Sequence, residues 1–300
     1  MRRAPARRRP PYHRPMTPNT PLRSTTRGEV PPEGPLRLGG IDLPAGVHVR
    51  PDDDDDADFD AVAAVSGAPP CAWVTDGAVE VELAQQWVRH LAFRFKDTGL
   101  WPIAVTGWDN DLERPWRSGE VLGPDEGSDF DVEAFLLSPG EPEDDEDPDI
   151  AAYLESIAPI ATVRELGGPV AAPPAGPQDL LVPWRDAEPV ALALIPALSP
   201  ADALTTLGWM GPANYDLAGA AIARIAVSWQ ERYHLTPVGI DFDQLMLQMP
   251  PRGLSRPEVM SLLAEVYRVC PDSYDQGGFP DLASFVRAVE SHPVLGLWWD

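Results

Sequence analysis

Residues 292–300 read HPVLGLWWD, with two adjacent tryptophans one position before the last residue. Chain ends usually fray unless they are tied to the fold. Leu295, Leu297 and Trp299 alternate with Gly296 and Trp298, which is the period of a β-strand. Apolar residues on both faces predict a strand that is buried on both sides. We therefore expect a core strand that its tryptophans clamp in place.

Upstream of this strand, the sequence predicts the order strand, helix, helix, strand, strand, helix, helix. VALALIPA (190–197) is a continuous apolar run of strand length. Capped helices are predicted at 199–208 and 216–234, followed by a hairpin of alternating residues at 237–249. SRPE (255–258) is a capping box that opens a further helix. This order predicts an α+β fold, with helices covering a C-terminal sheet of about four strands.

The first half of the chain predicts a smaller α+β region. It contains a strand pair at 38–49 and a helix whose apolar residues recur every four positions between Leu83 and Phe95. A buried strand is predicted at 100–105. Pro102 predicts that this strand has an edge or a bulge, because proline cannot donate to a strand ladder.

Composition divides the chain into four parts. Residues 1–36 are rich in arginine and proline and poor in apolar residues, which predicts a disordered basic tail. Translation from Met16 is an open alternative for this tail. The N-terminal α+β region is expected over 37–166, a linker rich in proline and glycine over 167–187, and a C-terminal domain over 188–300.

The charge of the chain is strongly uneven. Lysine and arginine total 23 against 47 aspartates and glutamates, a formal net charge of −24. Residues 1–37 hold nine arginines and two glutamates, or +7, which leaves −31 for 38–300. Such a body repels phosphate, so we expect no nucleic-acid binding by the folded part. An acidic surface serves solubility and also suits a basic protein partner.

The sequence argues against several classes of protein. Two distant cysteines, Cys71 and Cys270, are no disulfide framework, which predicts a cytoplasmic location. No apolar run is long enough for a membrane span, and no apolar segment follows the basic start, so neither a membrane protein nor a secretory signal is expected. No histidine has a near partner at ligand spacing and no glycine-rich phosphate loop is present. We therefore predict neither a metal site nor a cofactor.

Four stretches resemble a bacterial family known as domain of unknown function 4253. Two more stretches resemble the N-terminal extension of that family. The sequence departs from the usual pattern of the family at Gln230 and Tyr233, and both departures are mild. The resemblance implies no activity, because no activity is established for the family. The four stretches are LGWMGPAN (207–214), SWQERYHLTPVGIDFDQLMLQM (228–249), CPDSYDQGG (270–278) and LWWD (297–300), and the two further ones are GLWPI (99–103) and RPWRSGE (114–120).

The polar residues Asn214, Asp272, Gln276 and Asp300 lie in these stretches. One interpretation is a shared binding pocket with Trp299 as a wall. The other, which we favour, is loop closure: Asp272 caps backbone amides and Asn214 holds a left-handed turn. Buried indole N–H groups need acceptors, and loop carboxylates are candidates for that role.

Cys270 is the obvious candidate for a nucleophile. It continues the apolar stripe of the helix before it, however, which is where an inert buried cysteine lies. A pair with His234 or His292 would activate it, and Asp272 is the other candidate for a catalytic group.

These observations predict an acidic binding or interaction module without catalysis. A concrete version is an immunity-like protein that masks a basic protein partner through charge complementarity. One alternative is a hydrolase-type enzyme that uses Asp272 or Cys270. Another is a domain that binds a small metabolite.

Overall fold

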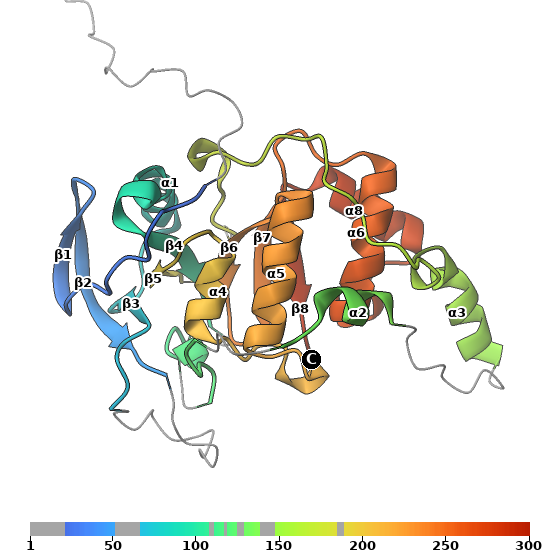
Figure 1. The fold of residues 1–300 in the computed structure, drawn as a ribbon, viewed down its shortest axis with the longest axis horizontal. Helices are drawn as coiled ribbons and strands as arrows, with labels where there is room; N and C mark the ends of the chain where they lie inside the picture. Colours follow the sequence, from blue (N-terminus) through green and yellow to red (C-terminus); the bar gives the residue numbers. More distant parts are fainter. Residues whose placement is uncertain are drawn as a thin grey trace, which may run out of the picture.

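One mixed sheet of eight strands organises the computed structural model (Figure 1), in the order β1-β2-β3-β5-β4-β6-β7-β8. The structure describes residues 22–51, 67–107, 111–116, 119–124, 129–138, 148–184 and 189–300, the side chains of 148–154 excepted. The strands are β1 (Gly34–Leu38), β2 (Ile41–Val49), β3 (Ala72–Thr75), β4 (Leu100–Val105), β5 (Ala191–Pro196), β6 (Thr236–Ile240), β7 (Gln244–Gln248) and β8 (Val294–Trp298).

The sheet joins the two halves of the chain. Strand β4, from the N-terminal half, lies between β5 and β6 and pairs antiparallel with β5 but parallel with β6. The α+β prediction is confirmed, whereas the prediction of a four-stranded C-terminal sheet beside a separate N-terminal region is wrong. Periodicity reports which face of a strand is buried but not which strand lies beside it.

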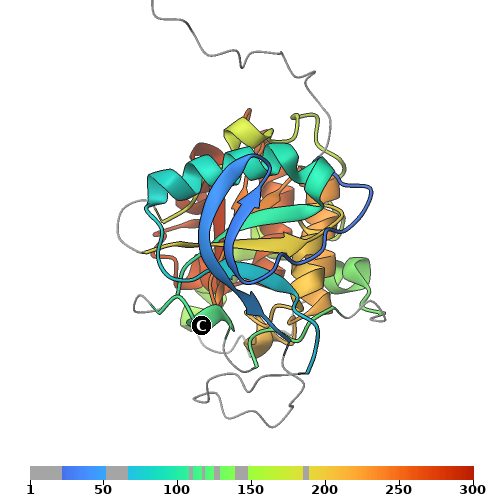
Figure 2. The same ribbon diagram turned by 90° about the vertical axis from the view of Figure 1, so that its left-hand side faces the viewer.

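The helices begin and end close to their predicted positions. The predicted helix 216–234 begins later, at Ala220, because Asp216 and Gly219 have φ angles of 54° and 58°, which no right-handed helix contains. Figure 2 shows the β1–β2 hairpin facing the viewer, with α1 along its upper side. The helices are α1 (Val81–Thr98), α2 (Val132–Leu137), α3 (Pro148–Ala161), α4 (Asp202–Leu207), α5 (Ala220–Tyr233), α6 (Arg256–Val269), α7 (Asp272–Asp275) and α8 (Leu282–Ser291), with short turns η2 (Arg114–Trp116), η3 (Pro177–Asp179) and η4 (Ala213–Tyr215).

Strands β4 and β5 form the centre of the core. Every residue of both strands is buried, so both faces of the sheet are covered there. Phe95 of α1 packs edge-on against Trp101, with ring centroids 5.2 Å apart. The buried Trp101 indole donates to the Pro237 carbonyl oxygen at 3.0 Å, so its polar group is satisfied across the β4–β6 junction.

Pro102 lies in this central strand and not at an edge, so that prediction is wrong. Its pairing partner in β5 is Leu194. The pairing of β4 with β6 covers only Ala104 and Val105. Along a central strand, successive backbone groups form hydrogen bonds alternately with one neighbouring strand and with the other. The N–H that Pro102 lacks would point toward β6, but β6 does not pair with β4 at this position, so no hydrogen bond is lost.

Strand β8 is an edge strand of the sheet and is buried on one face. Leu295, Leu297 and Trp299 are 5%, 0% and 2% exposed, as expected for a core strand. Gly296 is exposed and Trp298 is half-buried. The prediction of burial on both sides is therefore wrong, although one of the two adjacent tryptophans does anchor the strand in the core.

The predicted disordered tail is wrong for residues 22–36. Arg27 makes two hydrogen bonds to the Asp202 carboxylate, at 2.9 and 3.0 Å, and β1 begins at Gly34. Residues 1–21 lie outside the described residues. A bidentate pair between an arginine and a carboxylate fixes geometry as well as charge, so this segment is tied to α4.

The predicted linker contributes to the core instead of running free over its described residues. A buried carboxylate, Glu265, which is 2% exposed, accepts from the Gly167 backbone N–H at 3.2 Å. The same carboxylate accepts from Arg232 twice at 2.6 Å, from Tyr233 at 2.8 Å and from Trp229 at 2.9 Å. Apolar side chains of the segment are also buried, namely Val170, Ala175, Leu180 and Val182.

Candidate functional site at the carboxyl end of the sheet

Strands β4, β6 and β8 run in the same direction and end together. We call this the carboxyl end of the sheet. The loops that follow strands at such an end are where sheet proteins commonly build sites. The stretches resembling the family meet here: the Trp209 indole donates to the Asp241 carbonyl oxygen at 2.9 Å, and Asn214 reaches Asp300.

Asp272 is the hub of this end. Its carboxylate is 7% exposed and accepts from the Tyr215 hydroxyl at 2.6 Å, the Asp300 backbone N–H at 3.0 Å and the Gln276 amide at 3.1 Å. The Asn214 amide donates to the Asp300 carbonyl oxygen at 3.2 Å. The structure therefore brings together four predicted residues through contacts within the protein. Asn214, Gln276 and Asp300 are themselves exposed.

Tyr215 was not predicted from the sequence, although it directly follows Asn214. Its hydroxyl contacts the buried Asp272 carboxylate. Burial, and then this carboxylate, raise the pKa of Tyr215, so it remains a neutral donor. The hydrogen bonds of Asp272 close three loops at once, and one of its donors is a backbone amide, that of Asp300. The prediction that Asn214 holds a left-handed turn is wrong, because Asn214 lies within η4 and the positive φ of 54° belongs to Asp216.

Cys270 holds strand β8 instead of facing a histidine. Its Sγ donates to the Trp298 carbonyl oxygen at 2.9 Å and lies 2.9 Å from the Ser273 hydroxyl, which in turn accepts from the Trp298 backbone N–H at 3.2 Å. Burial raises the pKa of Cys270 to about 11. His234 caps α5 and His292 precedes β8, both at the opposite end of their elements from this thiol.

The tryptophans form the floor under these loops. Trp299 packs edge-on against Trp209 with ring centroids 5.8 Å apart and donates to the Val269 carbonyl oxygen at 2.8 Å. Trp298 donates to the Asp243 carboxylate at 3.0 Å. A loop carboxylate is thus the acceptor for Trp298, whereas backbone carbonyls serve Trp209 and Trp299.

A charged pair that the sequence did not point to lies near Asp243. Arg114 pairs with Glu120, which is 6% exposed, and its guanidinium lies 4.4 Å from the ring centroid of Phe242. Burial raises the pKa of Glu120 and of Asp243, and the Asp300 charge adds to the rise for Asp243. The sequence feature that could have indicated this ion pair is the stretch RPWRSGE, which contains both of its members.

The loop at 119–124 belongs to the N-terminal half but docks on the loop at 207–210. Val121 forms a bridge with Trp209, and the Gly123 backbone N–H donates to the Leu207 carbonyl oxygen at 2.8 Å. Both halves of the chain therefore build the carboxyl end of the sheet.

Neither a metal cluster nor a membrane span is found among the described residues. Within the described ranges, no group of three or more histidine, cysteine, aspartate or glutamate side chains is arranged to hold a metal ion. None of the helices that the structure describes has the length and apolar character needed to cross a membrane.

Residues 191–300 match the model of a family described as "Domain of unknown function (DUF4253)", which confirms the resemblance for the C-terminal part. The match does not include the stretches at 99–103 and 114–120, so their resemblance to the family's extension stays a prediction. No curated protein and no solved structure matches the chain.

Proposed function

We propose that this protein, whose C-terminal part is a DUF4253 domain with no activity in its description, is an acidic binding module. Its partner is a basic protein, which it captures at the carboxyl end of the sheet, as an immunity protein masks a basic toxin. The observation that carries the proposal is the acidic surface of this end. We place the protein in the cytoplasm, where its two free, buried cysteines would stay reduced.

Three acidic residues are exposed at this end, beside the neutral Asn214 and Gln276. Asp216, Asp275 and Asp300 are exposed, and the ranges 214–216 and 275–278 contain neither lysine nor arginine. The chain as a whole carries a formal net charge of −24. A surface of one sign accelerates association with a partner of the opposite sign and disfavours other partners.

The contacts of Asp272 and Cys270 favour binding over the hydrolase alternative. Three donors occupy the Asp272 carboxylate, and the Cys270 thiol is buried and neutral at physiological pH. A nucleophile needs an available lone pair and an adjacent base. Both side chains instead hold loops and strand β8 in the positions from which the acidic residues project.

The proposal predicts that binding depends on these particular carboxylates and not on total charge. We would measure the affinity of a labelled nine-residue oligoarginine peptide by fluorescence anisotropy near physiological salt, where charges are screened beyond about 8 Å. The variant Asp216→Asn/Asp275→Asn/Asp300→Asn is expected to bind about tenfold more weakly, since each lost contact costs on the order of 0.5–1 kcal/mol.

A matched variant controls for net charge. Glu29→Gln/Asp97→Asn/Glu165→Gln removes three charges from exposed residues that lie near other parts of the fold. Its affinity is expected to stay within a factor of two of the unmodified chain. Equal weakening by both variants would contradict a localised binding surface, and so would an unchanged affinity in both.

A further inference from the structure

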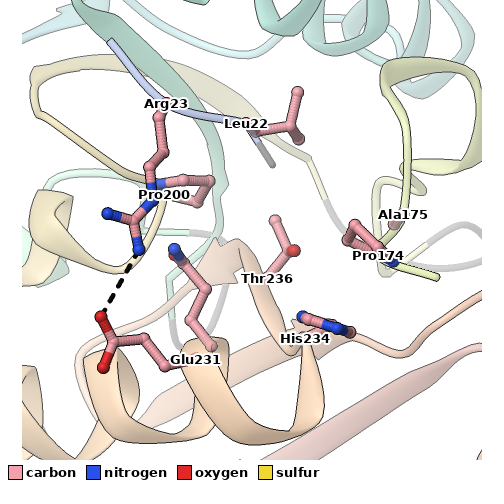
Figure 3. Close-up of a pocket in the computed structure, with 9 residues that line it drawn as sticks. Leu22, Arg23, Pro174, Ala175, Pro200, Glu231, His234 and Thr236 are labelled. Carbon is pink, nitrogen blue, oxygen red and sulfur yellow. Dashed lines mark hydrogen bonds and ion pairs between the residues drawn. The ribbon is translucent and has the colours of Figure 1, made fainter. Parts of the chain in front are cut away.

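A cavity of about 240 Å³ lies where helix α5 ends and strand β6 begins (Figure 3). It is at the opposite end of β6 from the carboxyl end of the sheet, since Thr236 lines the cavity and Asp241 follows the strand. The cavity is therefore separate from the surface assigned to the basic partner, and a ligand bound in it does not depend on that partner.

Opposite charges lie on the wall of this cavity. The Arg23 guanidinium contacts the Glu231 carboxylate at 3.4 Å, and the two side chains are 59% and 58% exposed. A single long contact between exposed groups contributes little to stability, because water competes for both partners. Either group is free to exchange this contact for one with a ligand.

The end of α5 adds further polar character. Tyr233 is the last residue of the helix and His234 caps it in the left-handed conformation, so the partial negative charge of the helix end lies beside Glu231. The His234 ring and the Thr236 side chain line the same cavity, between Glu231 and Pro174 in Figure 3. This side of the cavity favours a cationic group.

Apart from Gln230, the rest of the lining is apolar, and the space is small. Leu22, Pro174, Ala175 and Pro200 line the cavity together with the charged pair. Sites for drug-sized ligands are larger, roughly 300–1,000 Å³. A compact molecule about the size of leucine matches the space.

We propose that this cavity binds a free apolar α-amino acid as a zwitterion. The ligand carboxylate pairs with Arg23, its ammonium group pairs with Glu231 and the carbonyl end of α5, and its side chain packs against Leu22 and the prolines. One ligand thus replaces the Arg23–Glu231 contact at both of its ends. A carboxylate alone or an amine alone satisfies only one of the two charges.

Titration calorimetry on the full chain tests this with leucine, isoleucine and phenylalanine as probes. Isoamylamine and 4-methylvalerate carry the side chain of leucine with only one of its two charged groups, so they serve as half-ligands. We expect at least one amino acid to bind and its half-ligands to bind at least tenfold more weakly. Absence of binding by all three amino acids at tens of millimolar would overturn the proposal, as would a half-ligand that binds as tightly as leucine.

Two variants locate the binding. Arg23→Gln and Glu231→Gln are each expected to weaken the amino acid at least tenfold, whereas Arg37→Gln, an exposed arginine of β1, leaves its affinity unchanged. Thermal melting of each variant checks the fold, and the shift of the His234 ring protons on ligand addition gives a second readout in the unmodified chain. Unchanged affinity in both cavity variants, or an unmoved His234 signal at saturation, would place the binding elsewhere and reject the proposal.

Discussion

Cys270 illustrates how one side chain determines which backbone groups of an edge strand stay free. The thiol and Ser273 together occupy the carbonyl oxygen and the N–H of Trp298. An edge strand with free backbone groups invites pairing with another chain. These two side chains therefore block the end of β8 while fixing the tryptophan pair. The same burial that suits this role makes the thiol a poor nucleophile.

The titration of Cys270 gives a prediction at this scale. Burial raises the pKa of the folded-state thiol from 9.0 to about 11. The folded chain keeps the proton where the unfolded chain has lost it, so the stability due to this group is intact below about pH 9 and falls as the pH rises from 9 toward 11. The Cys270→Ser variant should lose less stability than the unmodified chain between pH 8 and pH 10.5.

Urea unfolding at the two pH values measures this difference. Cys71 also has a raised pKa, about 12, but it is present in both chains and its effect cancels. Equal losses of stability in the two chains would show that Cys270 titrates normally. Rapid alkylation of native Cys270 by iodoacetamide at pH 8 would show the same.

At the scale of elements, the end of α4 determines how the loops from the two halves of the chain meet at the carboxyl end of the sheet. Gly208 ends the helix with φ of 60°, and a Cβ atom at this position would lie 2.0 Å from the Gly123 carbonyl oxygen. Only glycine permits both the left-handed turn and the close approach of the 119–124 loop.

We predict that Gly208→Ala costs at least about 2 kcal/mol of unfolding free energy, from the left-handed conformation and the backbone clash together. Gly253→Ala is the matched control. Gly253 has φ of 67° but nothing within 4 Å of its Cβ position, so only the conformational cost of about 1 kcal/mol applies. Urea unfolding compares the two, and equal costs would mean that the loop does not dock on Gly208.

Sequence patterns predicted the helices and strands better than they predicted which strands pair with each other. The capping box of Ser255 and Glu258 forms as predicted, and the burial of Trp299 follows from strand alternation. The pairing of β4 with β5 has no such signal, because a continuous apolar run states only that a strand is buried on both faces. Pro102 even pointed away from the centre of the sheet.

The candidate site likewise contains residues that the sequence pointed to and a residue that it did not. One interpretation placed Asn214, Asp272, Gln276 and Asp300 in a shared pocket. They do meet: Gln276 and Asp300 donate to Asp272, and Asn214 donates to Asp300. Glu120 lies in the other half of the chain, and docking of its loop depends on backbone hydrogen bonds that any sequence makes. Its position therefore follows from the assembled sheet and not from a local pattern.

At the scale of the whole molecule, the sheet makes the chain one folding unit. Both sheet partners of β5, namely β3 and β4, come from the N-terminal half, and β6 reaches β5 only through β4. The span of the DUF4253 domain, residues 191–300, thus contains a strand with no partner of its own.

Expression of residues 188–300 alone tests this unity most directly, with residues 22–300 as the control. Near-ultraviolet circular dichroism reports the packing of the buried tryptophans, and thermal melting reports cooperativity. We predict that 22–300 melts in one cooperative transition and that 188–300 shows neither fixed tryptophan packing nor a cooperative melt. A cooperative, native-like melt of 188–300 would contradict a single folding unit and show that the C-terminal domain folds without β4.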